Sequence, residues 1–501
     1  MSVESAQVDA AVVGAGPTGL TLACLLAAEG IKVAVIDRSR LPISHPRATH
    51  LDDETMRTFQ TLGLQDLGRT FSPVGIYRFY DPKWRPVMAM AMDRGVTDQG
   101  WRSDYMFHQP DFEAVLRGRL MEDQNVEVIF GSEVSDLTEH EGGVEVSMRE
   151  LSTGEERHLT AAFAVGCDGS NSLVSSKMET TVTDYDATHC SLIVDILPFA
   201  HPAELPERDA FIQAGVRNPL TYIPIASPRL RFELMLRPDD EIAAFERIDR
   251  VQALLEPWLK ADQYRVLRAD VYEWHSTVTA PWRSGRLLLA GDAAHEMPPH
   301  LGQGMCSGVR DALNLAWKLG RVVRGESPPA LLETYETERS PHVATLVGIS
   351  AQMANEVESM QPEGSAAGDD PPVKEAQPVR PPLGPGIHVD GEVAGSLAAQ
   401  PTLDDGTLMD EALGYRFAVV GDPACMAAVS DDTRSLWHRL GVVSLDGQHA
   451  EVSRWLTTIK ANAVVLRPDR YVFGIADTRD DLESLTHQLE SQLSHEQIKA
   501  G

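Results

Sequence analysis

Short apolar runs on either side of a longer apolar segment open the chain. The runs at 8–15 and 32–38 favour strands, and the segment at 17–30 between them predicts a buried helix. A strand, a helix and a second strand in this order are typical of a parallel α/β sheet. Two later apolar runs, at 163–169 and 286–295, predict strands that return to the same sheet.

The pattern changes between 184 and 282, where β-favouring residues are concentrated. The segments 191–197, 219–225 and 229–236 predict strands of a second sheet, inserted between two parts of the first domain.

Two helices are predicted after the inserted region. Apolar residues recur at spacings of three and four between Met305 and Val323, which predicts a long amphipathic helix. A second helix is predicted to begin near Pro329 and to break near Pro341, because proline lacks the N–H that a helix interior uses.

The composition changes again near residue 356. Seven prolines lie between Pro362 and Pro385 among Gly, Ala, Asp and Glu, so 356–386 is predicted to be a linker. Beyond it, apolar runs at 416–422 and 460–476 and a final helical pattern predict a small α/β domain.

Composition and charge narrow the possible partners. With 43% hydrophobic and 24% charged residues the chain is globular, and its net charge of −30 repels phosphate backbones, so no nucleic-acid partner is expected. Glycine and proline interrupt the uncharged stretch 10–28, so we expect no membrane span. The five cysteines are far apart without a CxxC pair, and the N-terminus lacks a basic signal region. We therefore expect no disulfide framework, no metal site and a cytoplasmic protein.

A glycine motif joins the first predicted strand to the first helix. In the GxGxxG formed by Gly14, Gly16 and Gly19, the first glycine permits a tight turn and the second lets backbone approach a pyrophosphate. The third lets helix and strand pack closely, and the helix N-terminus offers free N–H groups to phosphates. Asp37 ends the next strand, where a carboxylate can bind ribose hydroxyls. The candidate dinucleotide-binding residues of this segment are Gly14, Gly16, Thr18, Gly19, Asp37 and Arg38.

Two later motifs favour FAD over a nicotinamide dinucleotide. Asp168 lies in the segment CDGSNS, and Asp292 lies in GDAAH at the end of a strand. A nicotinamide dehydrogenase needs only the first motif, whereas the long ribitol chain of FAD needs a further hydroxyl-binding side chain. The turn from Gly302 to Gly304 opens the long helix and aims its N–H groups at whatever precedes it, which suits the N1/C2=O edge of a flavin.

Together these motifs resemble those of the class A FAD-dependent aromatic monooxygenases, of the p-hydroxybenzoate hydroxylase and phenol hydroxylase type. The resemblance is greatest to 3-(3-hydroxyphenyl)propionate hydroxylase-like enzymes and covers about the first 350 residues. The C-terminal domain resembles the thioredoxin-like appendage of the phenol hydroxylase branch, mainly through RPDRYV at 467–472. The other matching motifs are GAGPTG at 14–19, PRA at 46–48, QP at 109–110, DG at 168–169, GDAAH at 291–295 and GQGMCSGVRDALNLAWK at 302–318.

The resemblance implies an α/β fold with three domains. A Rossmann-like FAD-binding domain is expected over 1–183 and 283–355, with an inserted substrate-binding β-sheet domain over 184–282. The linker 356–386 then leads to a thioredoxin-like C-terminal domain over 387–501. Because that domain lacks CxxC, we expect it to serve packing or subunit contact, as in a homodimer, rather than redox chemistry.

The resemblance also implies where FAD binds and what it does. Arg47 and Gln109 are expected near the cofactor and Asp292 at its ribitol, with Pro298 and a turn of Gly302, Gly304 and Met305 along the isoalloxazine ring. NADPH or NADH would reduce the flavin, O2 would form a 4a-hydroperoxide, and its distal oxygen would pass to a phenolic or related aromatic ring. The DG motif of the family usually ends in Arg, which the resemblance ties to binding both FAD and NAD(P)H, whereas this sequence has Ser175 and so leaves its affinity for NAD(P)H or its mode of binding open. The choice between NADH and NADPH is open as well.

Two residues are candidates for a catalytic role. Tyr222 alternates with apolar neighbours, so it either points into the substrate cavity or lies half-buried in the sheet. His300 follows the flavin-bordering prolines and either faces the substrate or supports the loop. Of the other polar side chains, we expect His295 to orient its turn and His50 to support FAD, while Arg231 is a sheet arginine unless it binds a substrate carboxylate.

Three functions are compatible with these residues. The first is hydroxylation of an aromatic ring. The second is another oxygen insertion on the same scaffold, namely epoxidation, oxidation of a heterocycle or insertion into a ketone. The third is a flavoprotein without productive oxygenation.

Overall fold

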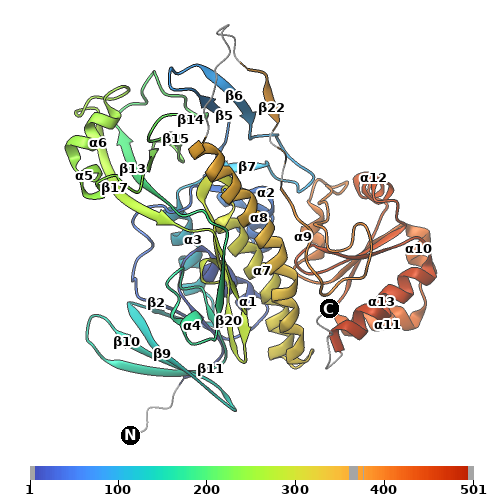
Figure 1. The fold of residues 1–501 in the computed structure, drawn as a ribbon. Coiled ribbons are helices and arrows are strands. Elements are labelled where there is room, and N and C mark those ends of the chain that lie inside the picture. The colour runs from blue at the N-terminus through green and yellow to red at the C-terminus, as the bar shows by residue number, and fades with distance from the viewer. Residues whose placement is uncertain (1–5, 360–370, 376, 378, 495–501) are drawn as a thin grey trace.

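The computed structural model of the chain describes residues 6–359, 371–375, 377 and 379–494. Two large sheets lie against the long helices α7 (Gly304–Val323) and α8 (Glu333–Ser359), and a smaller α/β domain lies on the other side of these helices (Figure 1). No helix in these described ranges is both long and apolar enough to cross a membrane.

The first sheet is the α/β sheet that the sequence predicts. Its strand order is β19 (Arg283–Ser284), β20 (Leu287–Leu289), β11 (Glu156–Gly166), β1 (Ala6–Val13), β2 (Val33–Asp37) and β8 (Val126–Phe130). Strands from β20 to β8 run parallel, and an antiparallel hairpin of β9 (Ser132–His140) and β10 (Gly143–Glu150) extends from β11. Helix α1 (Pro17–Ala28) packs on α7, and its apolar sequence is buried along most of its length. The carboxyl ends of β1, β2 and β20 therefore meet at one edge, where ligands bind in such sheets.

The second sheet contains the three strands predicted in the inserted region and five others. Its order is β17 (Tyr264–Trp274), β13 (His189–Pro198), β16 (Leu230–Leu236), β15 (Leu220–Pro224), β14 (Ala210–Gln213), β5 (Ile76–Tyr80), β6 (Pro86–Ala91) and β22 (Val373–Glu375). Strands β5 and β6 come from the first part of the chain, and β22 comes from the predicted linker. The second sheet is thus built from three separate stretches of sequence.

Residues of this sheet alternate between two different environments. Leu192, Val194 and Ile196 of β13 pack into an outer core that helix α6 (Ile248–Leu255) covers. Asp195 of the same strand faces the first domain, because its partner Arg231 donates hydrogen bonds to backbone there. The inner face, toward the first domain, is therefore the face available to a substrate.

Helix α8 is continuous through Pro341, so the predicted break is wrong. Proline leaves the carbonyl of Thr337, one turn earlier, without its usual helical partner. Gly384 lies directly against that turn: a Cβ at Gly384 would be 2.2 Å from Thr337 O, and its N–H donates to Glu338 O at 2.9 Å. The neighbouring segment thus packs on the helix at the point where proline weakens it.

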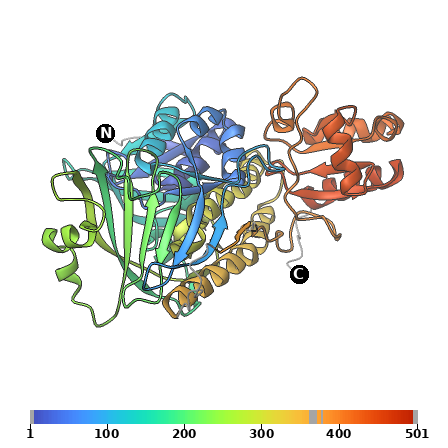
Figure 2. The same cartoon turned by 90° about the horizontal axis from the view of Figure 1, so that it is seen from above.

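The C-terminal domain has a four-stranded sheet in the order β24 (Val443–Asp446), β23 (Ala418–Gly421), β25 (Ala463–Leu466) and β26 (Val472–Ala476). Strands β23 and β24 are parallel, and the other pairs are antiparallel. Helices α11 (Asp431–Leu440), α12 (Ala450–Thr458) and α13 (Arg479–Ser494) accompany it, which completes the expected thioredoxin-like arrangement. The domain lies at the opposite end of the molecule from α6 (Figure 2).

The C-terminal domain shares a core with the first domain. The ring of Trp317 from α7 meets Phe417 edge-on, with centroids 5.3 Å apart, inside the hydrophobic core of the C-terminal domain. Beside it, Glu338 Oε2 accepts hydrogen bonds from Lys318 Nζ and Arg467 Nη2, both at 2.7 Å, and all three side chains are fully buried. An apolar contact and a buried ion cluster thus fix the docking of this domain.

We predict that Glu338→Gln destabilises the fold, because Lys318 and Arg467 would lose a buried countercharge. Breaking such a buried pair costs about 3–5 kcal/mol. The midpoint of urea denaturation should fall accordingly. Glu411→Gln, at an exposed carboxylate, is the matched control and should change stability by less than about 0.5 kcal/mol. Equal midpoints for the two variants would contradict this account of the interface.

Candidate functional site

The GxGxxG turn is packed too tightly for a side chain at two of its glycines. Gly14 has φ +100°, and a Cβ there would lie 2.3 Å from the carbonyl oxygen of Cys167. A Cβ at Gly19 would lie 2.0 Å from the carbonyl oxygen of Gly14. Around Gly16, in contrast, nothing lies within 4 Å of the Cβ position. The turn therefore has one open side at the N-terminus of α1, as a bound pyrophosphate requires.

Asp37 ties the end of β2 to this glycine turn. Its Oδ2 accepts a hydrogen bond from Ala15 N, and its Oδ1 accepts one from Ser39 N, each at 2.6 Å. Arg38 is exposed beside it. The carboxylate lies where the adenosine ribose is expected, and ribose binding by Asp37 and Arg38 stays a prediction.

Asp168 supports the glycine turn from the side. Ser172 Oγ and Leu173 N donate to its carboxylate at 2.5 and 2.7 Å, so both oxygens are used within its own loop. The Cα of Asp168 would lie 3.0 Å from a Cβ at Gly14, so this segment forms the wall behind the turn. Ser172 caps the short helix α4 (Leu173–Ser176) that follows, because its Oγ accepts a hydrogen bond from Ser175 N at 2.9 Å. The structure thus gives Asp168 a supporting position next to the expected cofactor.

Thr18 is the point where three distant segments meet. A Cβ at Gly291 would lie 2.6 Å from Thr18 Oγ1, and a Cβ at Gly308 of α7 would lie 2.2 Å from the same atom. Both glycines therefore permit α1, α7 and the turn that carries Asp292 to pack against each other. This contact brings the pyrophosphate turn and the GDAAH turn to one edge of the sheet.

A buried carboxylate holds the GDAAH turn from below. Asp311 accepts hydrogen bonds from Gly291 N at 3.1 Å, His295 Nε2 at 2.6 Å and Arg339 Nε at 3.0 Å. Burial raises the pKa of Asp311, but the charges of His295 and Arg339 outweigh burial and the pKa is lowered. His295 thus orients the turn, as the sequence suggests.

Asp292 follows Gly291 in this turn, and we infer that its side chain faces a recess at the edge of the sheet. Its side chain is exposed, yet burial among surrounding protein atoms raises its pKa, while the charges of His295 and Arg47 oppose that rise. A side chain that is accessible and also surrounded faces an internal hollow. This is the environment that a carboxylate needs to bind a ribitol hydroxyl.

The segment 46–48 is held from two sides. Gln109 Oε1 accepts hydrogen bonds from Arg47 N and Ala48 N, both at 2.8 Å. Arg231 donates to the carbonyl oxygens of Pro46 and Arg47 from the inserted sheet. The Arg47 side chain is left exposed on the recess of Asp292, so Gln109 acts by placing Arg47.

The turn before α7 is fixed by a histidine. Gly302 has φ +66°, and a Cβ there would lie 2.5 Å from His50 Nδ1. His50 bridges Gly302 O at 3.2 Å and Asp104 Oδ1 at 2.8 Å. Burial lowers the pKa of His50, but the hydrogen bonds to Asp104 and Gly302 O and the charges of Asp104 and Asp52 together outweigh burial, and the pKa is raised. No side chain caps the start of α7 at Gly304 and Met305, so its N–H groups are available to a flavin carbonyl.

Tyr222 does not face the recess. Its ring is fully buried against Phe211, with centroids 5.0 Å apart, and its hydroxyl donates to Pro206 O at 2.9 Å. It belongs to the outer core, because alternation along β15 turns Thr221 and Ile223 to the inner face instead. The structure therefore removes Tyr222 from the candidate catalytic residues.

His300 lies beside the flavin-bordering residues, between Pro298 and Gly302. Its ring meets Trp274 edge-on, with centroids 5.6 Å apart. Burial and the charge of His189 lower the pKa of His300 to about 4, so the imidazole is neutral at neutral pH. Among the residues that the structure describes, neither His300 Nε2 nor Trp274 Nε1 has a hydrogen-bond partner, although both atoms are buried.

Sequence reasoning missed Trp274 and His189. The register of β13 and β17 places these residues opposite each other, and their rings stack with centroids 4.7 Å apart. The run YRVLRADVYEW over 264–274 alternates as a strand does, so applying the strand pattern to that run would have predicted β17 and placed Trp274 at its end.

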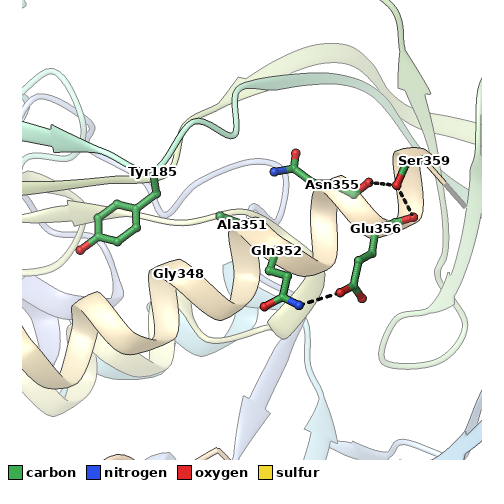
Figure 3. A pocket seen from close by; sticks show the side chains of 7 residues that line it. All are labelled: Tyr185, Gly348, Ala351, Gln352, Asn355, Glu356 and Ser359. Atoms are coloured by element: carbon green, nitrogen blue, oxygen red, sulfur yellow. Dashed lines mark hydrogen bonds between the residues drawn. The ribbon is translucent and has the colours of Figure 1, made fainter.

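A surface pocket of about 380 Å³ lies along the outer part of α8 (Figure 3). Tyr185 stands on one side, and Asn355 and its helical neighbours line the other. No predicted flavin-binding residue lines it, so this pocket is not the cofactor site. Asn355 Oδ1 contacts His189 Nε2 at 3.4 Å, so one side chain separates the pocket from Trp274.

These features together fit a flavin dinucleotide. Three features follow one another along the expected cofactor, from its phosphate end to its ring end: the open side of Gly16, the recess of Asp292 and the uncapped start of α7. FAD, when bound, would be held by these groups in that order. The chain thus has the fold and the site of a FAD-dependent monooxygenase with an inserted substrate sheet.

Comparisons with known proteins agree with this assignment to the FAD-dependent monooxygenases. Residues 7–350 match the family described as FAD binding domain, and residues 395–492 match the HcaD C-terminal domain. The chain belongs to this FAD-binding family, in the branch of flavin-dependent aromatic hydroxylases. The predicted family, fold class, FAD cofactor and nicotinamide co-substrate are confirmed.

Two relatives show the similarity along the whole chain. A 3-(3-hydroxy-phenyl)propionate/3-hydroxycinnamic acid hydroxylase of Mycolicibacterium gilvum is 35% identical, over 90% of this chain and 82% of that protein. A protein of Rhodococcus jostii named "Probable NADH-specific resorcinol 4-hydroxylase" is 31% identical, over 96% of this chain and 94% of its own.

Solved structures share the fold at lower identity. Aklavinone-11 hydroxylase, in a ternary complex with FAD and aklavinone, has a TM-score of 0.82 at 20% identity, covering 98% of this chain and 100% of that one. The flavin-dependent monooxygenase PieE, in complex with FAD and substrate, has a TM-score of 0.77 at 19% identity, covering 97% and 99%.

We predict that Asp292→Ala weakens FAD binding, because a cofactor hydroxyl would lose its acceptor. The loss of about 1–3 kcal/mol corresponds to a roughly 5- to 150-fold higher dissociation constant. FAD content after purification and titration of the apoprotein measure it. Asp292→Asn, which keeps an acceptor, should lose less. A fully loaded Asp292→Ala protein would exclude this role.

Proposed function

We propose that the protein hydroxylates a small aromatic ring bearing a phenolic hydroxyl, and that His300 and Trp274 bind that hydroxyl. The observation that carries this proposal is the pair of buried, unpartnered atoms His300 Nε2 and Trp274 Nε1 beside the flavin-bordering turn. A buried polar atom without a partner costs free energy unless a ligand supplies one. A hydroxyl group supplies both partners at once, because it donates to the imidazole and accepts from the indole N–H.

The residues of the chain orient the ring and exclude water. FAD, reduced by NADH or NADPH, supplies the activated oxygen from O2 when it is bound. A neutral His300 accepts the hydrogen bond of the phenol and so increases electron density on the ring. Its lowered pKa of about 4 makes His300 a poor base at neutral pH. His300 therefore orients the phenolic O–H through a hydrogen bond and does not take its proton.

The arginines of the inner face support recognition by hydroxyl rather than by carboxylate. Arg231 is buried and donates to both oxygens of Asp195, at 2.7 and 2.9 Å, as well as to Pro46 O. Arg268 pairs with Asp270 at 3.0 Å and also donates to Pro46 O. Both cations are engaged within the protein. The names of two relatives specify 3-(3-hydroxyphenyl)propionate, which carries a carboxylate, and resorcinol, which carries only hydroxyl groups. A substrate of the resorcinol type fits this arrangement better.

We predict that resorcinol accelerates NADH or NADPH oxidation with matching oxygen uptake, and that the product carries one added oxygen on the ring. Both coenzymes and 3-(3-hydroxyphenyl)propionate belong in the same panel, with product mass spectrometry. If only the carboxylated compound is turned over, hydroxyl recognition is wrong. Oxygen added elsewhere than on the ring would favour epoxidation, heterocycle oxidation or ketone insertion. If no aromatic compound accelerates coenzyme oxidation, a flavoprotein without productive oxygenation is favoured.

We predict that His300→Ala lowers kcat/KM for the phenol roughly 5- to 150-fold, because one hydrogen bond to the substrate is lost. FAD content should not change. His300→Gln, which can accept the same bond, should recover part of the loss, and His487→Ala at an exposed histidine should have no effect. Because His300 is already neutral above about pH 4, the unmodified enzyme should show no loss of activity from its protonation between pH 5 and 8. An unchanged kcat/KM in His300→Ala would exclude this role.

The compartment and the oligomeric state stay predictions. Five free thiols support the cytoplasm, where thiols stay reduced. A homodimer is to be tested by light scattering.

A further inference from the structure

The motif RPDRYV of the C-terminal domain reaches into the first domain. Tyr471 is buried, and its hydroxyl donates to Glu54 Oε1 at 2.9 Å. Glu54 lies in the first turn of α2 (Asp53–Thr61) and is itself buried. The two residues are 417 positions apart in the sequence, so this hydrogen bond crosses between domains.

The other oxygen of Glu54 leads to the flavin-bordering turn. Glu54 Oε2 accepts a hydrogen bond from Arg310 Nε at 2.5 Å. The same guanidinium donates from Nη1 to Gln303 Oε1 at 2.8 Å and from Nη2 to Asp52. Gln303 is the residue between Gly302 and Gly304, immediately before α7. Its Nε2 closes the network by donating to Asp52 Oδ2 at 3.1 Å.

The geometry of this network makes each member depend on the next. A carboxylate whose two oxygens bind different partners on opposite sides is fixed in orientation. The guanidinium is a rigid planar fork, so the position of Glu54 fixes the direction in which Arg310 reaches Gln303. Without the Tyr471 hydroxyl, the buried Glu54 Oε1 would lose a hydrogen-bond donor. The carboxylate would then be free to rotate toward Arg310.

We propose that Tyr471 is a positioning residue through which the C-terminal domain sets the turn at Gln303 beside the flavin. Sequence reasoning gave that domain only packing or subunit contact. The network assigns it a second role, acting on the cofactor end of the site from outside the FAD-binding domain. Tyr471 touches neither the cofactor nor the substrate in this account.

Tyr415 provides a matched control. It too belongs to the C-terminal domain, and its hydroxyl donates to Leu313 O at 2.5 Å and accepts from Trp317 N at 3.2 Å. Both partners lie on α7, like Arg310, but in the middle of the helix and outside the network of Gln303. Tyr415→Phe therefore removes an interdomain hydrogen bond without disturbing that network.

The test compares Tyr471→Phe with Tyr415→Phe in the full chain without aromatic substrate, so its result does not depend on the proposed reaction. Thermal unfolding should show similar decreases in Tm for both. Titration of apoprotein with FAD should show a dissociation constant about three- to tenfold higher for Tyr471→Phe only. The visible bands and the reduction potential of the bound flavin should shift in that variant only.

Glu54→Gln tests the same network if Tyr471→Phe fails to fold. The amide keeps an acceptor for Tyr471 but weakens the contact with Arg310, so FAD binding and the flavin spectrum should change as in Tyr471→Phe. Unaltered flavin properties in Tyr471→Phe or in Glu54→Gln would overturn the proposal. Equal flavin changes in Tyr471→Phe and Tyr415→Phe would also overturn it, because docking alone would then explain both.

Discussion

The close packing around Thr18 is the constraint on which the site depends. A Cβ at Gly291 or Gly308 would overlap its hydroxyl, and the glycine turn is equally tight at Gly14 and Gly19. Four positions without side chains therefore set the distance between the first helix, the helix α7 and the turn of Asp292. Once these segments are in contact, the phosphate end and the ring end of the cofactor site have a fixed separation. A methyl group at any of these positions would push the segments apart and change that separation.

The walls of the site are made rigid by cations that are not available to ligands. Arg231 spans Asp195 and the carbonyl of Pro46, Arg339 holds Asp311, and Arg310 holds Glu54 and Gln303. Each cation is buried and bonds to a segment other than its own, so it acts as a cross-link between parts of the chain. The net charge of −30 describes the surface and says little about this interior, where positive groups are paired one by one. Preorganisation of this kind lets a site hold a ring in position without moving.

The sequence was most informative where one residue type is the only one that fits. The glycine motif, Asp292 and the long helix after Gly302 were predicted because tight turns and amphipathic spacing leave a strong pattern. The orientation of Tyr222 could not be predicted, since PLTYIPI is apolar on both faces and its phase depends on α6 packing against one side. The packing of Gly384 on α8 beside Pro341 joins residues distant in the sequence, which no pattern near Pro341 reveals. The pairing of His300 with Trp274 arises from tertiary packing, so the sequence could place Trp274 on a strand but could not bring it next to His300.

The position of RPDRYV near the end of a chain of 501 residues has a consequence for biosynthesis. Domains generally fold from the N-terminus as they leave the ribosome. Here the first domain leaves the ribosome before Arg467 and Tyr471 are made, so Glu338 and Glu54 each lack one hydrogen-bond donor at that stage. The turn at Gln303 therefore lacks part of its support until the C-terminal domain has been made and has docked. We expect capture of FAD to follow that docking.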